Sequence, residues 1–194
     1  MHKWFTGALT VEQVQVAIAD LPPHHHGLRL VQLSDFHFDG WGLSPTLLRE
    51  AIARSNALQP DLIVLTGDFV TDTPTPIHTL APHLASLHSR YGTYAVLGNH
   101  DLRYRHSRQE VTTALTTHGI TVLWNEATYP VGPELAIVGL ADLWSNDFRP
   151  DVVLPSIPAQ IPRILLSHNP DSAALVRQWR VDLQLSGHTH GGQV

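Results

Sequence analysis

The sequence of 194 residues contains no cysteine. This absence excludes disulfide bonds, thiolate metal sites and a cysteine nucleophile, while it leaves the cellular compartment undetermined. Long hydrophobic runs are also absent, and no apolar stretch approaches the roughly 20 residues that a membrane-spanning helix requires. Because 43% of the residues are hydrophobic, as in ordinary globular proteins, we expect neither a transmembrane nor a disordered chain. The length predicts a single domain over residues 1–194.

Positive charge is scarcer than negative charge, with 12 Lys and Arg against 17 Asp and Glu and a formal net charge of −5. This balance disfavours a nucleic acid partner, although a local basic patch stays open. No apolar stretch of about 7–15 residues, as in a secretory signal, begins the chain, so the sequence as written predicts a cytoplasmic protein. A start site downstream of a lost anchor would leave the same sequence, so peripheral membrane association stays open.

Histidine, by contrast, is abundant, with 14 residues. Imidazole binds Zn, Fe, Mn or Ni and exchanges protons near neutral pH, so the histidines are the first candidates for chemistry. Three of them, His24, His25 and His26, directly follow Pro22 and Pro23. A histidine run beside prolines is more typical of a solvated loop than of a metal site.

Short apolar runs recur along the chain and alternate with helical patterns. Each run has the length of a strand and is rich in Leu, Val and Ile, as expected for strands that are covered on both faces. The runs are residues 28–33, 62–65, 94–97, 135–140, 164–166 and 181–185. Their alternation with helices predicts an α/β layered fold. Alternating apolar and polar residues from Val14 to Ile18 also predict a half-buried opening strand.

The predicted helices have recognisable ends. Ser44 followed by Pro45 is typical of a helix N-terminus, and residues 77–87 carry apolar side chains at helical spacing. Ser107 and Glu110 form the Ser-x-x-Glu pattern of a capping box, and Gly119 stands where that helix would end. Residues 145–162 contain prolines at four positions, which predicts a long surface loop and a candidate substrate lid.

Polar side chains with metal-binding chemistry follow five of the predicted strands. Open α/β sheets bind ligands at the carboxyl ends of their strands, so we expect these side chains to meet at one crevice. The segments are Ser34-Asp35-Phe36-His37, Thr66-Gly67-Asp68, Gly98-Asn99-His100-Asp101, Ser167-His168-Asn169 and Ser186-Gly187-His188-Thr189-His190.

Seven residues in these segments are candidate metal ligands: Asp35, His37, Asp68, Asn99, His168, His188 and His190. Seven exceeds the four ligands of a tetrahedral ion and suits two ions that share a bridging carboxylate, for which Asp68 is the natural candidate. Alternate residues of an extended segment share one side, which places Asp35 beside His37 on a common ion. The same alternation places His188 beside His190. Carboxylate, amide and imidazole donors without thiolate favour Mn, Fe or Zn, with Mg less expected.

Each segment alone is weak evidence, because an Asp after a strand commonly starts a turn and a single histidine is commonly a surface residue. The segment from Gly98 to Asp101 is stronger, since glycine permits a tight turn and polar side chains follow it at once. The recurrence at five strand ends makes a purely structural origin of the whole set implausible.

The order of these motifs resembles the calcineurin-like metallophosphoesterase superfamily. The C-terminal segment Gly-His-Thr-His-Gly-Gly-Gln, residues 187–193, and the segment Leu-Ser-His-Asn-Pro-Asp, residues 166–171, resemble its bacterial phosphodiesterase branch, which has membrane-anchored relatives. The resemblance extends from about residue 28 to the end of the sequence.

The resemblance implies a four-layer α/β sandwich, in which two mixed β-sheets face each other between helices, and a site for two divalent metal ions. Asp35, His37, Asp68 and His190 would hold one ion, and Asp68, Asn99, His168 and His188 the other. His100 would contact the substrate phosphate or protonate the leaving group, and Asp101 would orient it. The implied activity is hydrolysis of phosphodiester or pyrophosphate bonds in a small or lipid-linked substrate, with no protein partner expected.

The sequence departs from this branch at both ends. Its members usually continue for tens of residues beyond the Gly-Gly-Gln segment, whereas this sequence stops at Val194, four residues after His190. We therefore expect either a C-terminally truncated chain or a first metal site that is looser than the family's. Relatives also commonly carry an N-terminal anchor or export signal, which leaves the localisation open.

Two other functions stay open, an inactive interaction scaffold with the same fold and a nuclease. A scaffold has no reason to retain all seven candidate ligands together with His100, and the acidic balance disfavours a nuclease. Arg103 and Arg105 are candidates for a clamp on a second phosphate, although solvated surface arginines are the more common case. Trp41 and Trp144 are candidates either to pack against a base, sugar or acyl chain or to close the core.

Overall fold

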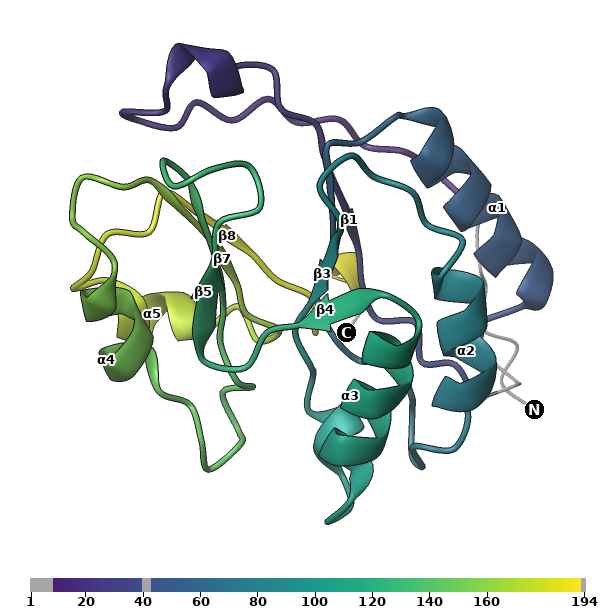
Figure 1. Cartoon of the computed structure of the whole chain (residues 1–194). Coiled ribbons are helices and arrows are strands. Elements are labelled where there is room, and N and C mark those ends of the chain that lie inside the picture. The colour runs from purple at the N-terminus through teal and green to yellow at the C-terminus, as the bar shows by residue number, and fades with distance from the viewer. Residues whose placement is uncertain (1–8, 40–42, 193–194) are drawn as a thin grey trace.

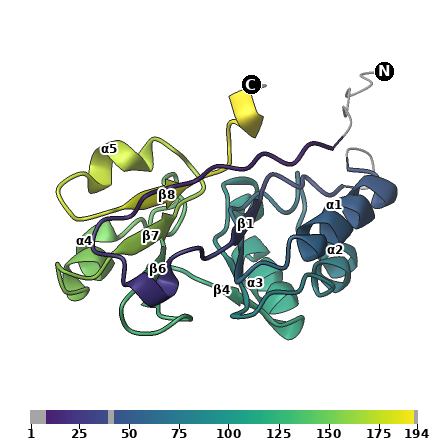
Figure 2. The same ribbon diagram turned by 90° about the horizontal axis from the view of Figure 1, so that it is seen from above.

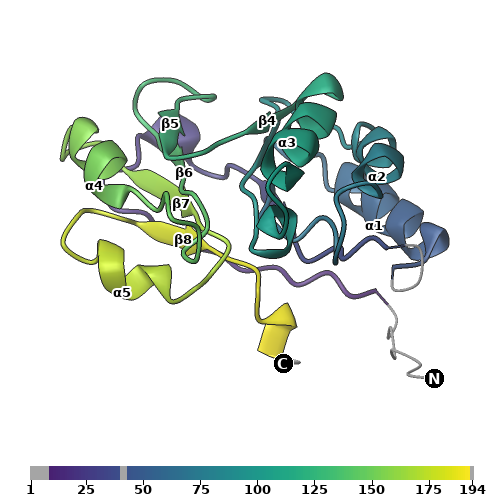
Figure 3. The same cartoon turned by 90° about the horizontal axis from the view of Figure 1, so that it is seen from below.

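Two four-stranded sheets lie between two groups of helices in the computed structural model of the chain (Figure 1). The structure describes residues 9–39 and 43–192, so Trp41 and Gln193 lie outside the described residues. Views from above and below show the layers in the order helices, sheet, sheet, helices (Figure 2, Figure 3). The four-layer α/β architecture expected from the sequence is therefore confirmed.

The first sheet has the order β1-β2-β3-β4 and is parallel in all its described pairings, so the expectation of two mixed sheets is wrong for this sheet. Its strands are β1 (Leu30–Leu33), β2 (Leu62–Leu65), β3 (Thr93–Ala95) and β4 (Ile120–Val122). The second sheet is mixed, because β5 runs antiparallel to β6 while β6, β7 and β8 are parallel. Its strands are β5 (Glu126–Thr128), β6 (Ala136–Gly139), β7 (Arg163–Leu166) and β8 (Leu183–Leu185).

All six apolar runs predicted as strands are confirmed. The strands β4 and β5 were not predicted, because each has three residues of mixed exposure and so gives little periodic signal. The β2 and β6 strands are buried at every position. This burial on both faces is the reason that they read as unbroken apolar runs.

Helices cover the outer face of each sheet. The first sheet is covered by α1 (Pro45–Ala57), α2 (Ile77–Leu84) and α3 (Ser107–Thr117), and the second by α4 (Pro150–Val153) and α5 (Ser172–Val176). Four 3-10 turns complete the described elements: η1 (Pro23–His25), η2 (His100–Leu102), η3 (Leu154–Ser156) and η4 (His190–Gly192). Across residues 9–39 and 43–192, no helix has the length and apolar character needed to cross a membrane.

Apolar side chains fill each of the three interfaces between layers. Between the sheets, Leu62 and Val64 of β2 share a cluster with Ile137 of β6 and Leu166 of β7. The helix-covered faces hold two further clusters, one on each sheet. This packing fixes the two sheets against each other, and it thereby fixes the carboxyl ends of their strands.

Two of the three predicted helix ends are confirmed. The Ser44 hydroxyl accepts a hydrogen bond from the amide of Leu47 at 3.1 Å, and Gly119 follows α3 with a φ of 79°. The predicted capping box is wrong. Ser107 is already the first residue of α3, and Glu110 pairs with His78 at 3.0 Å instead of capping the helix.

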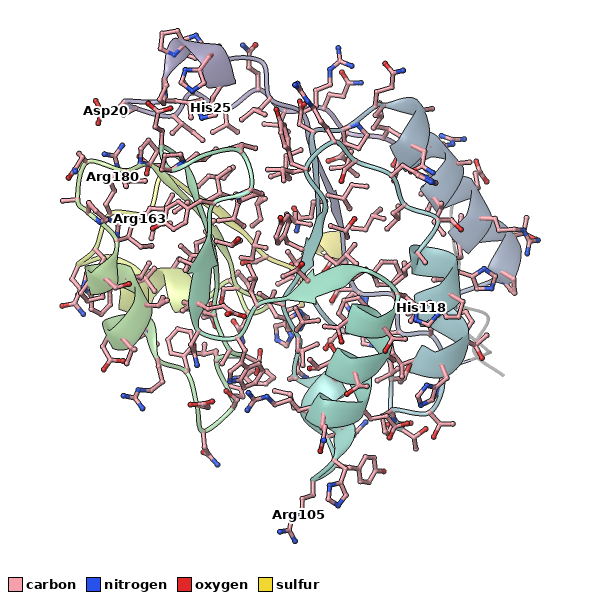
Figure 4. The ribbon with its side chains drawn as sticks, in the orientation of Figure 1. Asp20, His25, Arg105, His118, Arg163 and Arg180 are labelled. Carbon is pink, nitrogen blue, oxygen red and sulfur yellow. The ribbon has the colours of Figure 1, made fainter. Side chains whose placement is uncertain are left out.

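The predicted opening strand is wrong, because residues 14–18 form no strand and Val14 is 82% exposed. An alternating pattern makes a strand only where a neighbouring strand offers hydrogen-bond partners. This segment is held from its end by Arg180, which donates to the carbonyl of Ala19 at 2.8 Å and pairs with Asp20 at 3.1 Å (Figure 4).

The prediction of a long surface loop over residues 145–162 is wrong for its middle part. That part forms α4 and η3, and Val153, Leu154 and Ile157 are buried in the core of the second sheet. The buried guanidinium of Arg163 also donates to the carbonyl of Leu154 at 2.8 Å and to that of Ile157 at 3.0 Å. These contacts anchor the middle of the segment in the core, where it does not form a surface loop.

Candidate metal centre

The carboxyl ends of five strands converge on one site that draws on both sheets. Asp35 and His37 follow β1, Asp68 follows β2, Asn99 and His100 follow β3, His168 follows β7, and His188 and His190 follow β8. The amide of His188 donates to the Asp35 carboxylate at 2.9 Å, which joins the loop after β8 to the loop after β1. The predicted gathering of these residues is thus what the structure shows.

The first group of potential ligand atoms comes from Asp35, His37 and His190. One atom from each residue lies within 4.8 Å of the others. The two imidazole Nε2 atoms of His37 and His190 are 3.0 Å apart, and Nε2 of His190 is 3.8 Å from the Asp35 carboxylate. The Asp68 carboxylate lies 3.5 Å from Nε2 of His37 and so borders the same group.

The second group comes from Asp68, His168 and His188, whose potential ligand atoms also lie within 4.8 Å of one another. Nε2 of His168 is 3.2 Å from the Asp68 carboxylate and 3.2 Å from the side-chain oxygen of Asn99. The other ring nitrogen, Nδ1, meets the carbonyl oxygen of Thr66 at 2.7 Å. A carbonyl on one ring nitrogen orients the imidazole and leaves the other nitrogen for a cation.

The backbone at the candidate ligands is not extended. Asp35 and His37 still lie in one group, as predicted, but the predicted pairing of His188 with His190 is wrong. The φ angles are positive at Asp35 (53°), His37 (41°), Asp68 (55°), His188 (70°) and His190 (48°). Side chains therefore do not simply alternate, and His188 and His190 fall into different groups. Left-handed backbone at non-glycine residues costs free energy and is concentrated at functional sites.

Three glycines let the backbone approach the candidate ligands closely. A Cβ atom at Gly98 would overlap the Asp68 carboxylate, and one at Gly67 would lie 2.8 Å from Nδ1 of His168. A Cβ atom at Gly187 would overlap the Ser34 hydroxyl and lie 2.7 Å from an Asp35 carboxylate oxygen. These positions require glycine because a side chain would displace a candidate ligand.

Replacing Gly187 by alanine is expected to weaken divalent metal binding by about 10–100-fold, as expected when the support of a ligand is disturbed. The added methyl group presses on the Asp35 carboxylate and on the Ser34 hydroxyl. Isothermal titration with Mn²⁺ measures the effect. Gly119→Ala is the matched control for strain, because its Cβ meets no atom within 4 Å and the cost of its φ of 79° falls on the end of α3 and not on a candidate ligand. Equal Mn²⁺ affinities in the two variants would contradict the prediction.

The buried pair of Asp68 and His168 dominates the electrostatics of the site. Burial disfavours the charged form of His168, but the hydrogen bond and charge of Asp68 outweigh it and raise the pKa of His168 to about 9. Burial also acts to raise the pKa of Asp68, yet His168 lowers it overall. Burial lowers the pKa of His37. The proton on His168 thus lies where a bound cation would take its place.

The donor set fits divalent metal ions. It combines carboxylates, an amide oxygen and imidazoles, which is the set that suits Mn, Fe or Zn. Asp68 is 1% exposed. Its carboxylate belongs to the second group and also to a third group, which it forms with His37 and His100. A buried carboxylate shared between two groups of histidines is the arrangement expected of a ligand that bridges two cations.

Comparison with known proteins identifies the family. The sequence profile of the calcineurin-like phosphoesterases matches residues 28–192, which include every candidate ligand. The chain belongs to the calcineurin-like phosphoesterase family. The side-chain clusters described above could hold divalent metals, as the name of a metallophosphoesterase family leads one to expect.

This phosphoesterase is 36% identical over 170 residues to "Phosphodiesterase YaeI" of Escherichia coli (strain K12), with 86% of this chain and 62% of the relative aligned. It is 29% identical over 218 residues to "UDP-2,3-diacylglucosamine pyrophosphatase LpxG" of Chlamydia trachomatis serovar D, with 88% of this chain and 66% of the relative aligned. The crystal structure of TT1561 of Thermus thermophilus shares the fold with a TM-score of 0.59 at 13% identity, covering 82% of this chain and 81% of that chain. The chain spans about two thirds or less of the length of the curated relatives it matches.

His100 lies against the metal groups of the phosphoesterase. One of its ring nitrogens is within 4.8 Å of potential ligand atoms of His37 and Asp68. Its Nδ1 is 2.5 Å from the carbonyl oxygen of Thr71, and its amide donates to Asp68 at 3.0 Å. Because Thr71 accepts the Nδ1 proton, Nε2 is the nitrogen available to a substrate.

Asp101 does not have the role predicted for it. Its buried carboxylate accepts hydrogen bonds from the amides of Phe69 at 2.9 Å, Val70 at 3.2 Å and Gly98 at 2.9 Å. Burial and the charge of Asp68 raise the pKa of Asp101 to about 7. The residue thus joins the loops after β2 and β3, and the carbonyl of Thr71 orients the ring of His100.

Asp142 was missed by the sequence reasoning. It follows β6 as Asp35 follows β1, so the strand-end rule, applied also to the predicted strand over residues 135–140, would have found it. The residue is 1% exposed, and burial raises its pKa. One carboxylate oxygen accepts from the amide of Trp144 at 2.9 Å. The Trp144 ring is 63% exposed and meets the His188 ring edge-on at 4.8 Å, so it borders the metal centre.

The arginines proposed as a phosphate clamp are surface residues. Arg103 pairs with Asp72 and its side chain is half exposed. Arg105 extends from the tip of the loop before α3, away from the rest of the molecule (Figure 4). The structure therefore favours the alternative of solvated surface arginines over a forked clamp.

Proposed function

We propose that this phosphoesterase hydrolyses phosphodiester or pyrophosphate bonds with two divalent metal ions bound to the residues of the centre. Asp35, His37, Asp68 and His190 would hold one ion, and Asp68, Asn99, His168 and His188 would hold the other. The observation that carries this proposal is the shared Asp68 carboxylate, 3.5 Å from His37 and 3.2 Å from His168. Mn, Fe or Zn are the metals that suit these donors.

Two metal ions in such a site lower the pKa of a bound water and neutralise charge on the phosphate oxygens. The residues of the chain position the groups that would hold these ions. Thr66 holds the ring of His168, and the Asp35 carboxylate fixes the loop of His188 through its amide. These contacts set the geometry before substrate binds, which limits the reorganisation needed for reaction.

His100 is proposed to donate a proton from Nε2 to the oxygen of the leaving group. Its Nδ1–H is held by the Thr71 carbonyl at 2.5 Å, so the ring can gain and lose a proton at Nε2 without turning. General acid catalysis of this kind contributes typically about 10²–10⁴-fold to rate.

The proposed substrate is a small molecule or a lipid-linked phosphoester. The named activities of two relatives, a phosphodiesterase and a UDP-2,3-diacylglucosamine pyrophosphatase, support this class. The exposed ring of Trp144 beside His188 offers an apolar surface for a base or an acyl chain next to the reacting phosphate. A nucleoside diphosphate lipid has both a base and an acyl chain, and either group could lie against Trp144 while the diphosphate lies at the centre.

The experiment starts from the metal-free, folded protein. Addition of Mn²⁺ is expected to restore hydrolysis of bis-(p-nitrophenyl) phosphate. A panel of monoesters, diesters and nucleoside diphosphate lipids is then expected to give the highest kcat/KM with a diester or a diphosphate lipid. A folded protein that hydrolyses none of them with Mn²⁺, Fe²⁺, Zn²⁺ or Mg²⁺ would reject the proposal.

A further inference from the structure

A second cluster of potential metal ligands lies outside the catalytic centre, on η1 and the turn before β6. It consists of His24, His25 and Glu134, each of which offers an atom within 4.8 Å of the others. Nε2 of His24 is 2.8 Å from the Glu134 carboxylate, and the rings of His24 and His25 have their centroids 4.2 Å apart. This group shares no residue with the groups of the catalytic centre.

The histidine at the middle of this cluster is buried. His25 is 5% exposed, and its Nε2 is enclosed without a hydrogen-bond partner within the part of the chain that the structure describes. A buried polar nitrogen without a partner is costly and calls for an explanation, for which an ion ligated by that nitrogen is a candidate. Figure 4 shows His25 on η1 at the end of the molecule that also carries Asp20 and Arg180.

The backbone holds the two histidines in place. Pro22 and Pro23 precede them, and each proline restricts its own φ angle. The amides of His25 and His26 donate to the carbonyls of Pro22 at 2.9 Å and Pro23 at 3.1 Å, which closes the 3-10 turn. The sequence pattern favoured a solvated loop here. The structure instead has a 3-10 turn that holds His24 and His25 beside Glu134, a residue far away in the sequence.

We propose that His24, His25 and Glu134 form a binding site for a zinc ion, or another divalent cation that prefers imidazole. Two imidazoles and one carboxylate are a known protein ligand set for Zn²⁺, with the fourth position left to water. Glu134 directly precedes Leu135 of the core between the sheets, and Leu21 and Leu28 pack on the same core. The ion would therefore fasten residues 21–28 to the turn before β6 and stabilise the contact between the N-terminal segment and the second sheet.

The chain itself offers a matched control. His26 is the third residue of the same run, but its Nε2 lies 3.2 Å from the carbonyl of Leu21, and it belongs to none of the groups. If the site is fixed, substitution of His24 weakens Zn²⁺ binding and substitution of His26 does not. If the histidine run binds metal in any conformation, the two substitutions weaken Zn²⁺ binding equally.

The test counts tight Zn²⁺ equivalents by titration of the metal-free protein against a chromophoric chelator. The wild type and His26→Ala are expected to bind one equivalent more than His24→Ala and Glu134→Gln, whose Zn²⁺ affinity at this site falls at least about tenfold. His24, His26 and Glu134 are all exposed, so the substitutions are expected to leave the fold intact. Circular dichroism of each variant verifies that it is folded. Because the readout is a difference between variants, it holds whether or not the catalytic centre binds two ions.

A local measurement completes the test. Zn²⁺ is expected to slow amide hydrogen exchange of residues 21–28 in the wild type and in His26→Ala, but not in Glu134→Gln. Equal Zn²⁺ counts and equal exchange in the wild type and Glu134→Gln would overturn the proposal and leave an ion pair between His24 and Glu134. An equal loss of Zn²⁺ in His24→Ala and His26→Ala would overturn it in favour of adventitious binding by the histidine run.

Discussion

Replacing Asp68 by asparagine is expected to remove both metal ions and to lower kcat/KM for bis-(p-nitrophenyl) phosphate by at least about 10³-fold, since the ions supply several kcal/mol of transition-state stabilisation. The side chain is 2% exposed and lies between His37 and His168. An amide in this position loses the negative charge that two cations would share. Its NH₂ group would also point hydrogen atoms at one of the two cation positions.

Elemental analysis of the purified variant measures the loss of ions, and initial rates measure the loss of activity. Asp151→Asn is the matched control, because its side chain is 61% exposed and pairs only with Arg149 at 3.5 Å among the contacts of the described residues. The control is expected to keep both ions and full activity. An Asp68→Asn protein that retains both ions, or activity within threefold of the wild type, would remove the bridging role.

Replacing His100 by alanine is expected to leave the metal content unchanged and to lower kcat by about 10²–10⁴-fold for substrates with a poor leaving group. The loss follows from removal of the proton donor at Nε2. For bis-(p-nitrophenyl) phosphate the loss is expected to be much smaller, because p-nitrophenolate leaves without protonation. The comparison of two diesters in one variant therefore separates proton donation from substrate binding.

His106→Ala is the control for this prediction, because His106 is exposed at the start of α3. Metal content decides between two roles of His100. Its ring nitrogen lies within 4.8 Å of potential ligand atoms of His37 and Asp68, so a variant that loses metal would make His100 a ligand. An equal fall in rate for good and poor leaving groups would count against a general acid.

The fold could be predicted from the sequence wherever burial is complete. The fully buried β2 and β6 read as unbroken apolar runs, and Ser44 and Gly119 marked helix ends because their roles are local. The errors have a different origin. Residues 14–18 alternate like a strand but have no partner strand, and the proline-rich residues 145–162 fold into the core through side chains such as Leu154.

The candidate site could be predicted as a set of residues but not as an arrangement. Asp35, Asp68 and His168 are recognisable because each follows an apolar run that forms a strand. Asp142 follows β6 in the same way and was missed, and Asp101 was given a contact that the Thr71 carbonyl makes instead. Contacts of this kind depend on how neighbouring loops pack, which a motif does not specify.

The amino-acid sequence by itself determined the α/β class, the strands of the core and the kinds of donor atom at their carboxyl ends, since these follow from local burial and side-chain chemistry. Only the tertiary structure decided which donors share a position. His37 meets His190 across 153 residues and His168 meets Thr66 across 102, because the core between the two sheets aligns their strand ends. Left-handed backbone at His188 and His190 then sends their rings to different groups, a consequence of packing that no periodicity in the sequence specifies.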